Sequence, residues 1–215
     1  MDQIKILVLN ICTIASSANL TILNSFIRLH QADLVLLQEV AVSVFNFPGY
    51  EEIVNLGPRR RGTAMLFKSG LPLQQFTLLP SGRAMSARLH GTTLINVYAP
   101  AGTQGRRARE AFFTAELAPL LASAGGKLLA AGDWNSVLTG ADTTGAAYPC
   151  STLKVIIRDM GLVDAWQRLR PGEAGFTYVA PQGACASRLE PRPHLPQRPD
   201  QQHSAAHRRP AGHHE

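Results

Sequence analysis

Hydrophobic positions along this chain gather into short blocks, and several of these blocks end abruptly in a polar side chain. The apolar runs 4–10, 32–39 and 127–133 end at Asn10, Glu39 and Asp133. Short apolar runs bounded by glycine or polar residues are typical of buried strands. Glycine and proline turns separate four more runs of this kind. These further expected strands are 63–68, 76–79, 87–89 and 93–97.

Apolar residues at helical spacing occupy segments between these runs. Ser16, Ser17 and Asn19 are N-cap candidates for a helix that extends to His30. A second helix is predicted from Arg106 to Leu121, with a bend at Pro119, and a third at 153–160. Strand, helix and strand in succession predict a parallel pair with a right-handed crossover, which would place Asn10 and Glu39 at neighbouring strand ends. The pattern therefore predicts an α/β domain.

The stretch after the strand 127–133 carries the first candidate chemistry. Asp133 and Asn135 can project together from the loop beyond the strand, while Trp134 turns back to pack. A Gly-Asp turn is more often only a turn, so this motif depends on its companions. Tyr98 also lies at a strand end. Arg59, Arg60 and Arg61 form either a solvated loop or a contact with a phosphate backbone.

Composition narrows the choice of compartment and partner. The 215 residues carry a formal charge of +6 and 45% hydrophobic residues, which suits one globular domain and permits a polyanionic partner. Three cysteines without C-x-x-C spacing argue against a disulfide framework or a structural zinc site, so a reducing intracellular compartment is expected. Cys12 and Cys150 are interpreted as buried thiols. Neither a signal peptide nor a membrane span is predicted.

The globular pattern ends near residue 190. Strands are expected at 176–179 and 184–189, whereas residues 191–215 contain five Pro, five His and four Arg. Such a segment buries too little apolar surface to offset the entropy of ordering the chain. We divide the sequence into a domain at 1–190 and a disordered tail at 191–215. One hypothesis is that the tail is an out-of-frame translation of a former strand; the alternative is a genuine disordered or metal-binding tail.

Six motifs in this order resemble the endonuclease/exonuclease/phosphatase superfamily, and within it the endonuclease domain of LINE-type retrotransposon polyproteins. The resemblance covers about residues 4–189. It implies a two-sheet α/β sandwich with helices on the outer faces, DNase I-like and here lacking the last strand or strands. The motifs are Leu9-Asn10-Ile11, Gln38-Glu39, Arg61-Gly62-Thr63-Ala64, Asn96-Val97-Tyr98-Ala99-Pro100, Gly132-Asp133-Trp134-Asn135 and Ser187-Arg188-Leu189.

The resemblance also assigns roles to individual residues. Glu39 would bind the metal with Asn10 beside it, the ion being Mg²⁺ or alternatively Mn²⁺. Asp133 would orient or deprotonate the attacking water. Asn135 would hold that carboxylate and a phosphate oxygen, and Tyr98 would donate to the phosphate. Contacts with phosphate or DNA are expected from Arg61 and Arg188.

The resemblance fails at the carboxyl end. Members of the superfamily continue into an Asp and a later Ser-Asp-His motif, whereas Glu190 stands at the expected Asp and no Asp-His pair follows. We therefore expect a Mg²⁺-dependent DNA endonuclease that is weakened or inactive in this truncated chain. A catalytically dead nucleic-acid-binding remnant and a phosphatase of the same superfamily remain alternatives. DNA is the expected partner, without a membrane or an obligate protein partner, and a nuclear location follows if chromosomal DNA is the target.

Overall fold

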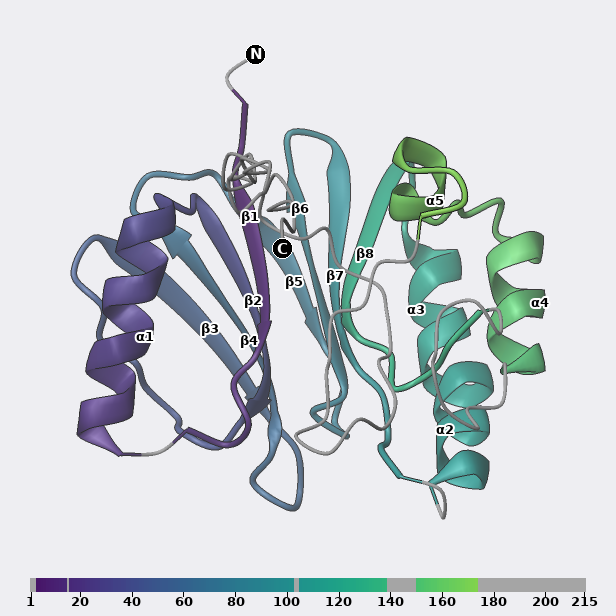
Figure 1. The fold of residues 1–215 in the computed structure, drawn as a ribbon, viewed down its shortest axis with the longest axis horizontal. Helices are drawn as coiled ribbons and strands as arrows, with labels where there is room; N and C mark the ends of the chain where they lie inside the picture. Colours follow the sequence, from purple (N-terminus) through teal and green to yellow (C-terminus); the bar gives the residue numbers. More distant parts are fainter. Residues whose placement is uncertain (1–2, 15, 103–104, 139–149, 174–215) are drawn as a thin grey trace, which may run out of the picture.

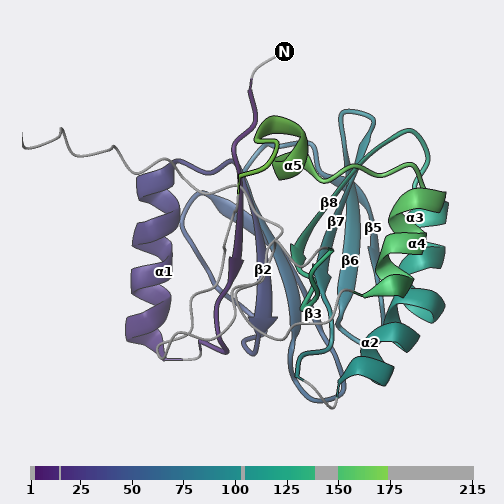
Figure 2. The same ribbon diagram turned by 45° about the vertical axis from the view of Figure 1, so that its right-hand side comes forward.

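The computed structural model describes residues 3–14, 16–102, 105–138 and 150–173 as two β-sheets packed face to face between helices. Figure 1 shows the sheets in the centre, with α1 on one outer side and α2, α3 and α4 on the other. Figure 2 shows the same arrangement of layers from a view turned by 45°. Among the described residues, no helix is long and apolar enough to cross a membrane.

Among the described residues, each sheet has four strands and mixes parallel with antiparallel pairing. The first sheet has the order β1-β2-β4-β3, in which only β1 and β2 are parallel. Its strands are β1 (Ile6–Asn10), β2 (Leu34–Val40), β3 (Tyr50–Leu56) and β4 (Gly62–Lys68). The second sheet has the order β5-β6-β7-β8, in which only β7 and β8 are parallel. Its strands are β5 (Gln74–Leu78), β6 (Ala84–Leu89), β7 (Thr92–Tyr98) and β8 (Lys127–Asp133).

The helices lie where the spacing of apolar residues predicts them, with two differences. α1 (Ser17–His30) starts after Ser16, one of the predicted cap candidates, whose side chain accepts a hydrogen bond from the Asn19 amide. The predicted helix 106–121 is α2 (Arg106–Phe112), a π-helical turn η1 (Phe113–Leu117) and α3 (Ala118–Ser123), so the irregularity precedes Pro119. α4 (Ser151–Asp159) is confirmed, while α5 (Ala165–Leu169) was not predicted.

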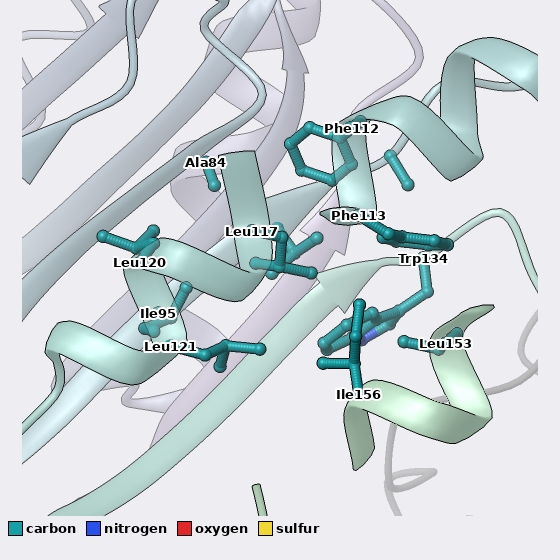
Figure 3. Packing of buried hydrophobic residues seen from close by; sticks show 12 residues of the cluster. Ala84, Ile95, Phe112, Phe113, Leu117, Leu120, Leu121, Trp134, Leu153 and Ile156 are labelled. Atoms are coloured by element: carbon teal, nitrogen blue, oxygen red, sulfur yellow. The ribbon is translucent and has the colours of Figure 1, made fainter. Parts of the chain in front are cut away.

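The hydrophobic core has three layers that follow the period-two alternation of the strands. Leu34 and Leu36 point between the sheets, while Val35 and Leu37 point toward α1 and contact a cluster that includes Ile27. A third cluster fills the space between the second sheet and η1, α3 and α4. Figure 3 shows this cluster with the Trp134 side chain among apolar neighbours, so the prediction that Trp134 packs in the core is confirmed.

The expected strands 176–179 and 184–189, the tail at 191–215 and the missing last strand lie outside the described residues. Within them, the two-sheet α/β sandwich with outer helices is confirmed. The carboxyl ends of β1, β2, β7 and β8 bring residues from both sheets to one end of the sandwich, since β1 and β2 run parallel, β7 and β8 run parallel, and β1 lies against β8.

Candidate active site

One amide nitrogen joins the two predicted carboxylates. The Asn10 Nδ2 atom donates to Glu39 Oε1 at 3.1 Å and to Asp133 Oδ2 at 2.8 Å. The Asn10 Oδ1 atom faces away and accepts from the Cys12 backbone amide at 2.9 Å. Glu39 Oε2 accepts a longer hydrogen bond, 3.4 Å, from Thr13 Oγ1. The structure thus brings together side chains from β1, β2 and β8, as the sequence predicts.

A local irregularity aims Glu39 toward this cluster. Asn10 is paired in register with Gln38, one residue before Glu39. The antiparallel pairing of β2 with β4 shifts between Gln38 and Val40, and Glu39 itself has a φ of 55°, in the left-handed region. A bulge of this kind re-aims a side chain that regular pairing would direct elsewhere. The strained backbone at Glu39 is therefore an observation that favours a functional position.

The Gly-Asp-Trp-Asn turn fixes Asp133 through backbone geometry. Gly132 has a φ of 136°, and a Cβ at this position would lie 2.0 Å from the Val97 carbonyl oxygen, so only glycine fits. The Asn135 backbone amide donates to Asp133 Oδ1 at 3.0 Å. The Asn135 side chain donates to the Ala99 carbonyl at 2.9 Å. The predicted hold of Asn135 on the Asp133 carboxylate is thus supplied by its backbone.

Buried amides tie the two sheets together directly behind the cluster. Gln38 Nε2 donates to Asn96 Oδ1 at 2.7 Å, and Asn96 Nδ2 donates to the carbonyls of Leu37 and Ala64, each at 2.9 Å. Both side chains are fully buried. The geometry of such buried hydrogen bonds is tightly constrained, because breaking one would leave a polar group with neither water nor a protein partner. This tie sets the position of β2 against β7, and so of Glu39 against Tyr98.

Tyr98 lies at the end of β7 with only 3% of its surface exposed. The Arg83 guanidinium carbon lies 4.5 Å from the centre of the Tyr98 ring. Burial raises the pKa of the Tyr98 phenol, and the Glu39 charge raises it further, while Arg83 and Arg61 act in the opposite direction. The phenol is therefore a protonated donor at neutral pH.

The surroundings of Asp133 shift the pKa of its carboxyl upward. Burial raises the pKa of its carboxyl above the usual value of 3.8, and the Glu39 charge adds to this, whereas the hydrogen bonds from Asn10 and Asn135 lower it. A carboxylate whose pKa is raised accepts a proton more readily than an exposed one.

The sequence of residues 9–153 matches the Endonuclease/Exonuclease/phosphatase family, and this span contains all the residues of the cluster described above. The match covers more than half of the chain. The chain belongs to the Endonuclease/Exonuclease/phosphatase family. This family consists of hydrolytic nucleases and phosphatases, so the chain is expected to be an enzyme of that kind. No curated protein sequence matches it significantly.

Solved structures of low sequence identity have the same DNase I-like fold. An AP endonuclease from Archaeoglobus fulgidus is 18% identical with a TM-score of 0.68, covering 84% of this chain and 79% of its own. The 3′ phosphatase NExo from Neisseria, bound to a product DNA hairpin, is 19% identical with a TM-score of 0.67, covering 85% and 80%. The endonuclease domain of TRAS1, a telomere-specific non-LTR retrotransposon, is 15% identical with a TM-score of 0.52, covering 74% and 72%. The fold of the family is thereby established for this chain.

Several positions in this family member differ from the sequence prediction or lie beyond it. Cys12 is exposed and Cys150 is partly buried, so the expectation of buried thiols was wrong for Cys12. The chain turns at Cys12 with a φ of 47°, which directs it away from the core that β1 enters. Arg188 lies outside the described residues. Arg61 is exposed and close enough to Tyr98 for its charge to act on the phenol.

Among the described residues near this cluster, sequence reasoning missed Arg83, as well as Thr13, whose hydroxyl donates to Glu39. Arg83 follows a Ser-Gly turn and precedes β6, and a basic residue in such a place is normally a solvated part of a turn. The signal that could have pointed to Tyr98 is the pairing of β6 with β7. Arg83 directly precedes Ala84, which pairs with Val97, the residue before Tyr98.

Proposed function

We propose that this chain hydrolyses DNA phosphodiester bonds with the help of Mg²⁺, as an endonuclease of the retrotransposon type acting inside the cell. The single observation that carries the proposal is the Asn10 amide between Glu39 and Asp133. Two carboxylates that share one hydrogen-bond donor form a strongly negative, partly buried site. Such a site suits a divalent cation and a water molecule that must lose a proton.

The donor set at the cluster fits Mg²⁺. Carboxylate oxygens are the ligands that Mg²⁺ prefers, and this ion keeps several waters and uses only one or two carboxylates from the protein. Glu39 would hold the ion. Because Asn10 Oδ1 accepts from the Cys12 amide, we assign Asn10 to holding the carboxylates in place instead of direct ligation. When bound, the ion would polarise the phosphate and offset its developing charge.

Asp133 would take the proton of the attacking water. Its Oδ2 atom accepts a hydrogen bond from Asn10, and its Oδ1 atom accepts one from the Asn135 backbone amide. Burial raises its pKa and so favours the uptake of a proton. The backbone hydrogen bond from Asn135 keeps the carboxylate in a single orientation.

Tyr98 would donate to a non-bridging oxygen of the phosphate. Its phenol stays protonated because burial and Glu39 raise its pKa. Removing a donor that acts on developing charge commonly lowers the rate by about 10²–10³-fold. The resemblance to the superfamily also implies a histidine from a Ser-Asp-His motif at the scissile phosphate. The two histidines in the described part of the chain, His30 and His90, lie at the ends of their elements that are remote from the cluster. We therefore propose slow turnover for this chain.

DNA is the proposed polyanion. The chain carries a net charge of +6, and Arg59, Arg60 and Arg61 are exposed on the loop between β3 and β4. The loop is closed by a hydrogen bond from the Gly57 amide to the Arg61 carbonyl. It packs on the turn that precedes Arg83, since Gly57 closely approaches Ser81. The basic loop therefore lies at the end of the sandwich that carries Glu39 and Tyr98.

Incubation with supercoiled plasmid tests the proposal. We expect slow Mg²⁺-dependent nicking that EDTA abolishes and that Asp133→Asn and Glu39→Gln each reduce by at least about 100-fold. Arg28→Ala, at the far end of α1, is the matched control and should nick at the parental rate. Nicking that survives both Asp133→Asn and Glu39→Gln would overturn the assignment of the site.

A second candidate substrate is DNA with an abasic site or a 3′-phosphate. The AP endonuclease and the 3′ phosphatase superimpose with higher TM-scores, 0.68 and 0.67, than the TRAS1 domain at 0.52. A panel of three duplexes, intact, with one abasic site and with a 3′-phosphate, separates these activities. Preference for the abasic duplex over intact DNA would favour this second candidate.

A further inference from the structure

Arg83 stands out among the basic residues near the cluster because its guanidinium lies against an aromatic ring. The guanidinium carbon is 4.5 Å from the Tyr98 ring centre, within the range of a cation–π contact. Its Nη1 atom also donates to the Ala99 carbonyl at 3.5 Å. No ion pair of the described residues involves Arg83. Its charge is thus directed at Tyr98 and at the backbone that follows it.

Arg83 also contacts the backbone of Tyr98 and of Ala99, the residue that follows it. The Tyr98 amide donates to the Arg83 carbonyl at 2.7 Å, so the two residues are also joined through the main chain. The Ala99 carbonyl that accepts from Arg83 accepts from the Asn135 side chain at 2.9 Å as well. Arg83 therefore contacts the Tyr98 ring and shares one acceptor with Asn135.

The turn that carries Arg83 is held from three other elements. Asn55 on β3 donates to the carbonyls of Leu79 and Ala84, which flank the turn. Thr63 on β4 donates to the Gly82 carbonyl at 3.2 Å. Gly82 has a φ of 73°, and a Cβ there would lie 2.3 Å from the Gly57 amide nitrogen. The backbone of Arg83 is thereby confined to one position.

The π-helical turn η1 supplies the fourth support. Glu116 in η1 accepts a hydrogen bond from the Ser81 hydroxyl, and the Ser81 Oγ atom in turn accepts from the Arg83 backbone amide at 3.3 Å. π-helical turns are rare and occur frequently at functional sites. Here the turn places a carboxylate where it fixes the residue that contacts Tyr98.

We propose that Arg83 is a positioning residue, which holds the Tyr98 ring and the Ala99 carbonyl in the arrangement that phosphoester hydrolysis requires. The proposal rests on the function proposed above. Arg83 acts through Tyr98, and a change at Arg83 affects the rate of the chemical step more than the binding of DNA. A residue that contacted the DNA phosphate directly would instead affect binding and its dependence on salt.

Four variants separate these roles: Arg83→Met, Arg83→Lys, Tyr98→Phe and the double variant Arg83→Met/Tyr98→Phe. We expect Arg83→Met to lower kcat by about 10- to 100-fold with little change in KM, since it removes support for a group that acts in the transition state. Arg83→Lys should recover part of the loss because it restores the cation. In the Tyr98→Phe background, Arg83→Met should lower kcat by less than about 2-fold more, because contacting residues with one function are not additive.

Arg88→Met is the matched control. Arg88 lies on β6, the strand that directly follows Arg83, and both side chains are partly buried. Arg88 pairs with Thr93 at the end of β7 remote from Tyr98. Its removal should leave kcat unchanged. A rise in KM at unchanged kcat in Arg83→Met would overturn the proposal and make Arg83 a DNA contact, and full additivity with Tyr98→Phe would overturn it as well.

A readout independent of hydrolysis is the NMR spectrum of ring-labelled tyrosine, in which Tyr98→Phe identifies the Tyr98 signal. We expect this signal to shift in Arg83→Met and to remain in place in Arg88→Met. An unshifted signal would overturn the positioning role even if the parent cleaves DNA. A shifted signal in a protein that hydrolyses no phosphoester would support the contact and refute the proposed function alone.

Discussion

Asn10 and Asp133 are 123 residues apart in the chain, yet the Asn10 Nδ2 atom lies 2.8 Å from the Asp133 Oδ2 atom. Asn10 ends β1 of the first sheet, and Asp133 ends β8 of the second. The hydrogen bond therefore crosses from one sheet to the other at the site itself. A second bond from the same nitrogen to Glu39 makes Asn10 the centre of the cluster.

Replacing Asn10 by Ala should destabilise the fold and the site together. Both carboxylates would lose a shared donor, and we expect the free energy of unfolding to fall by about 1–3 kcal/mol at neutral pH. Asn19→Ala, at an exposed position of α1 whose backbone amide makes the cap contact, is the control and should change it little. Urea unfolding measures both variants. Equal stability of Asn10→Ala and the parent would show that the bridge contributes nothing.

Asp133 should make the stability of the protein depend on pH. Because burial raises its pKa above 3.8, the neutral carboxyl is favoured in the folded state. Its stabilising contribution is then fully present below pH 3.8 and is lost as the pH rises through the raised value. We expect the free energy of unfolding of Asp133→Asn, relative to that of the parent, to increase as the pH rises from 3.8 through the raised pKa of Asp133.

Urea unfolding of both proteins at a series of pH values checks this expectation. A difference that is constant with pH would contradict it. Hydrolysis by the parent should increase over the same window, because only the ionised carboxylate can accept a proton.

Gly132→Ala should be strongly destabilising. The added Cβ would lie 2.0 Å from the Val97 carbonyl oxygen, and the φ of 136° is unfavourable for any other residue. Combined steric conflict and backbone strain predict a loss of roughly 2–4 kcal/mol. Gly125→Ala is the control, because nothing lies within 4 Å of a Cβ there and its φ is not positive. Thermal unfolding would show a similar stability for both variants if the close approach to Val97 were unimportant.

The basic loop should contribute to DNA affinity through phosphate contacts. Replacing Arg59, Arg60 and Arg61 by Ala should weaken binding equally for unrelated sequences and reduce the slope of log K against log salt by roughly 1–3, because each lost phosphate contact contributes about 0.9 to that slope. Fluorescence anisotropy at several salt concentrations, in the presence of EDTA, measures this without cleavage. A parental slope in the triple variant would exclude the loop from the interface.

The sequence predicted the candidate site better than the surroundings that support it. Asn10, Glu39, Tyr98 and Asp133 could be found because each interrupts an apolar run at a strand end, where polar side chains have no packing role. Their convergence follows from parallel pairing, which strand–helix–strand succession indicates. The bulge at Glu39 could not be found, since the left-handed conformation of a glutamate leaves no mark in the pattern.

Interactions between segments far apart in the chain could not be predicted from the sequence either. Gln38 and Asn96 look like ordinary polar residues in strands, and only the packing of one sheet on the other makes them a buried pair. Arg83 looked like part of a turn, because its partner Tyr98 is selected by the register of β6 against β7. The π-helical turn before Pro119 arises from the helix as a whole, whereas the sequence indicated only that the proline disturbs it.

Each sheet of the sandwich is built from a contiguous stretch of chain. In the part of the chain that the structure describes, β1 to β4 lie between residues 6 and 68, and β5 to β8 lie between residues 74 and 133. The short connection at 69–73 links these two stretches. Cutting the chain at this connection would yield two fragments, each with the four described strands of one sheet. Neither fragment contains both Asn10 and Asp133, so hydrolysis by the mixture would measure how well the separated halves find each other and reassemble.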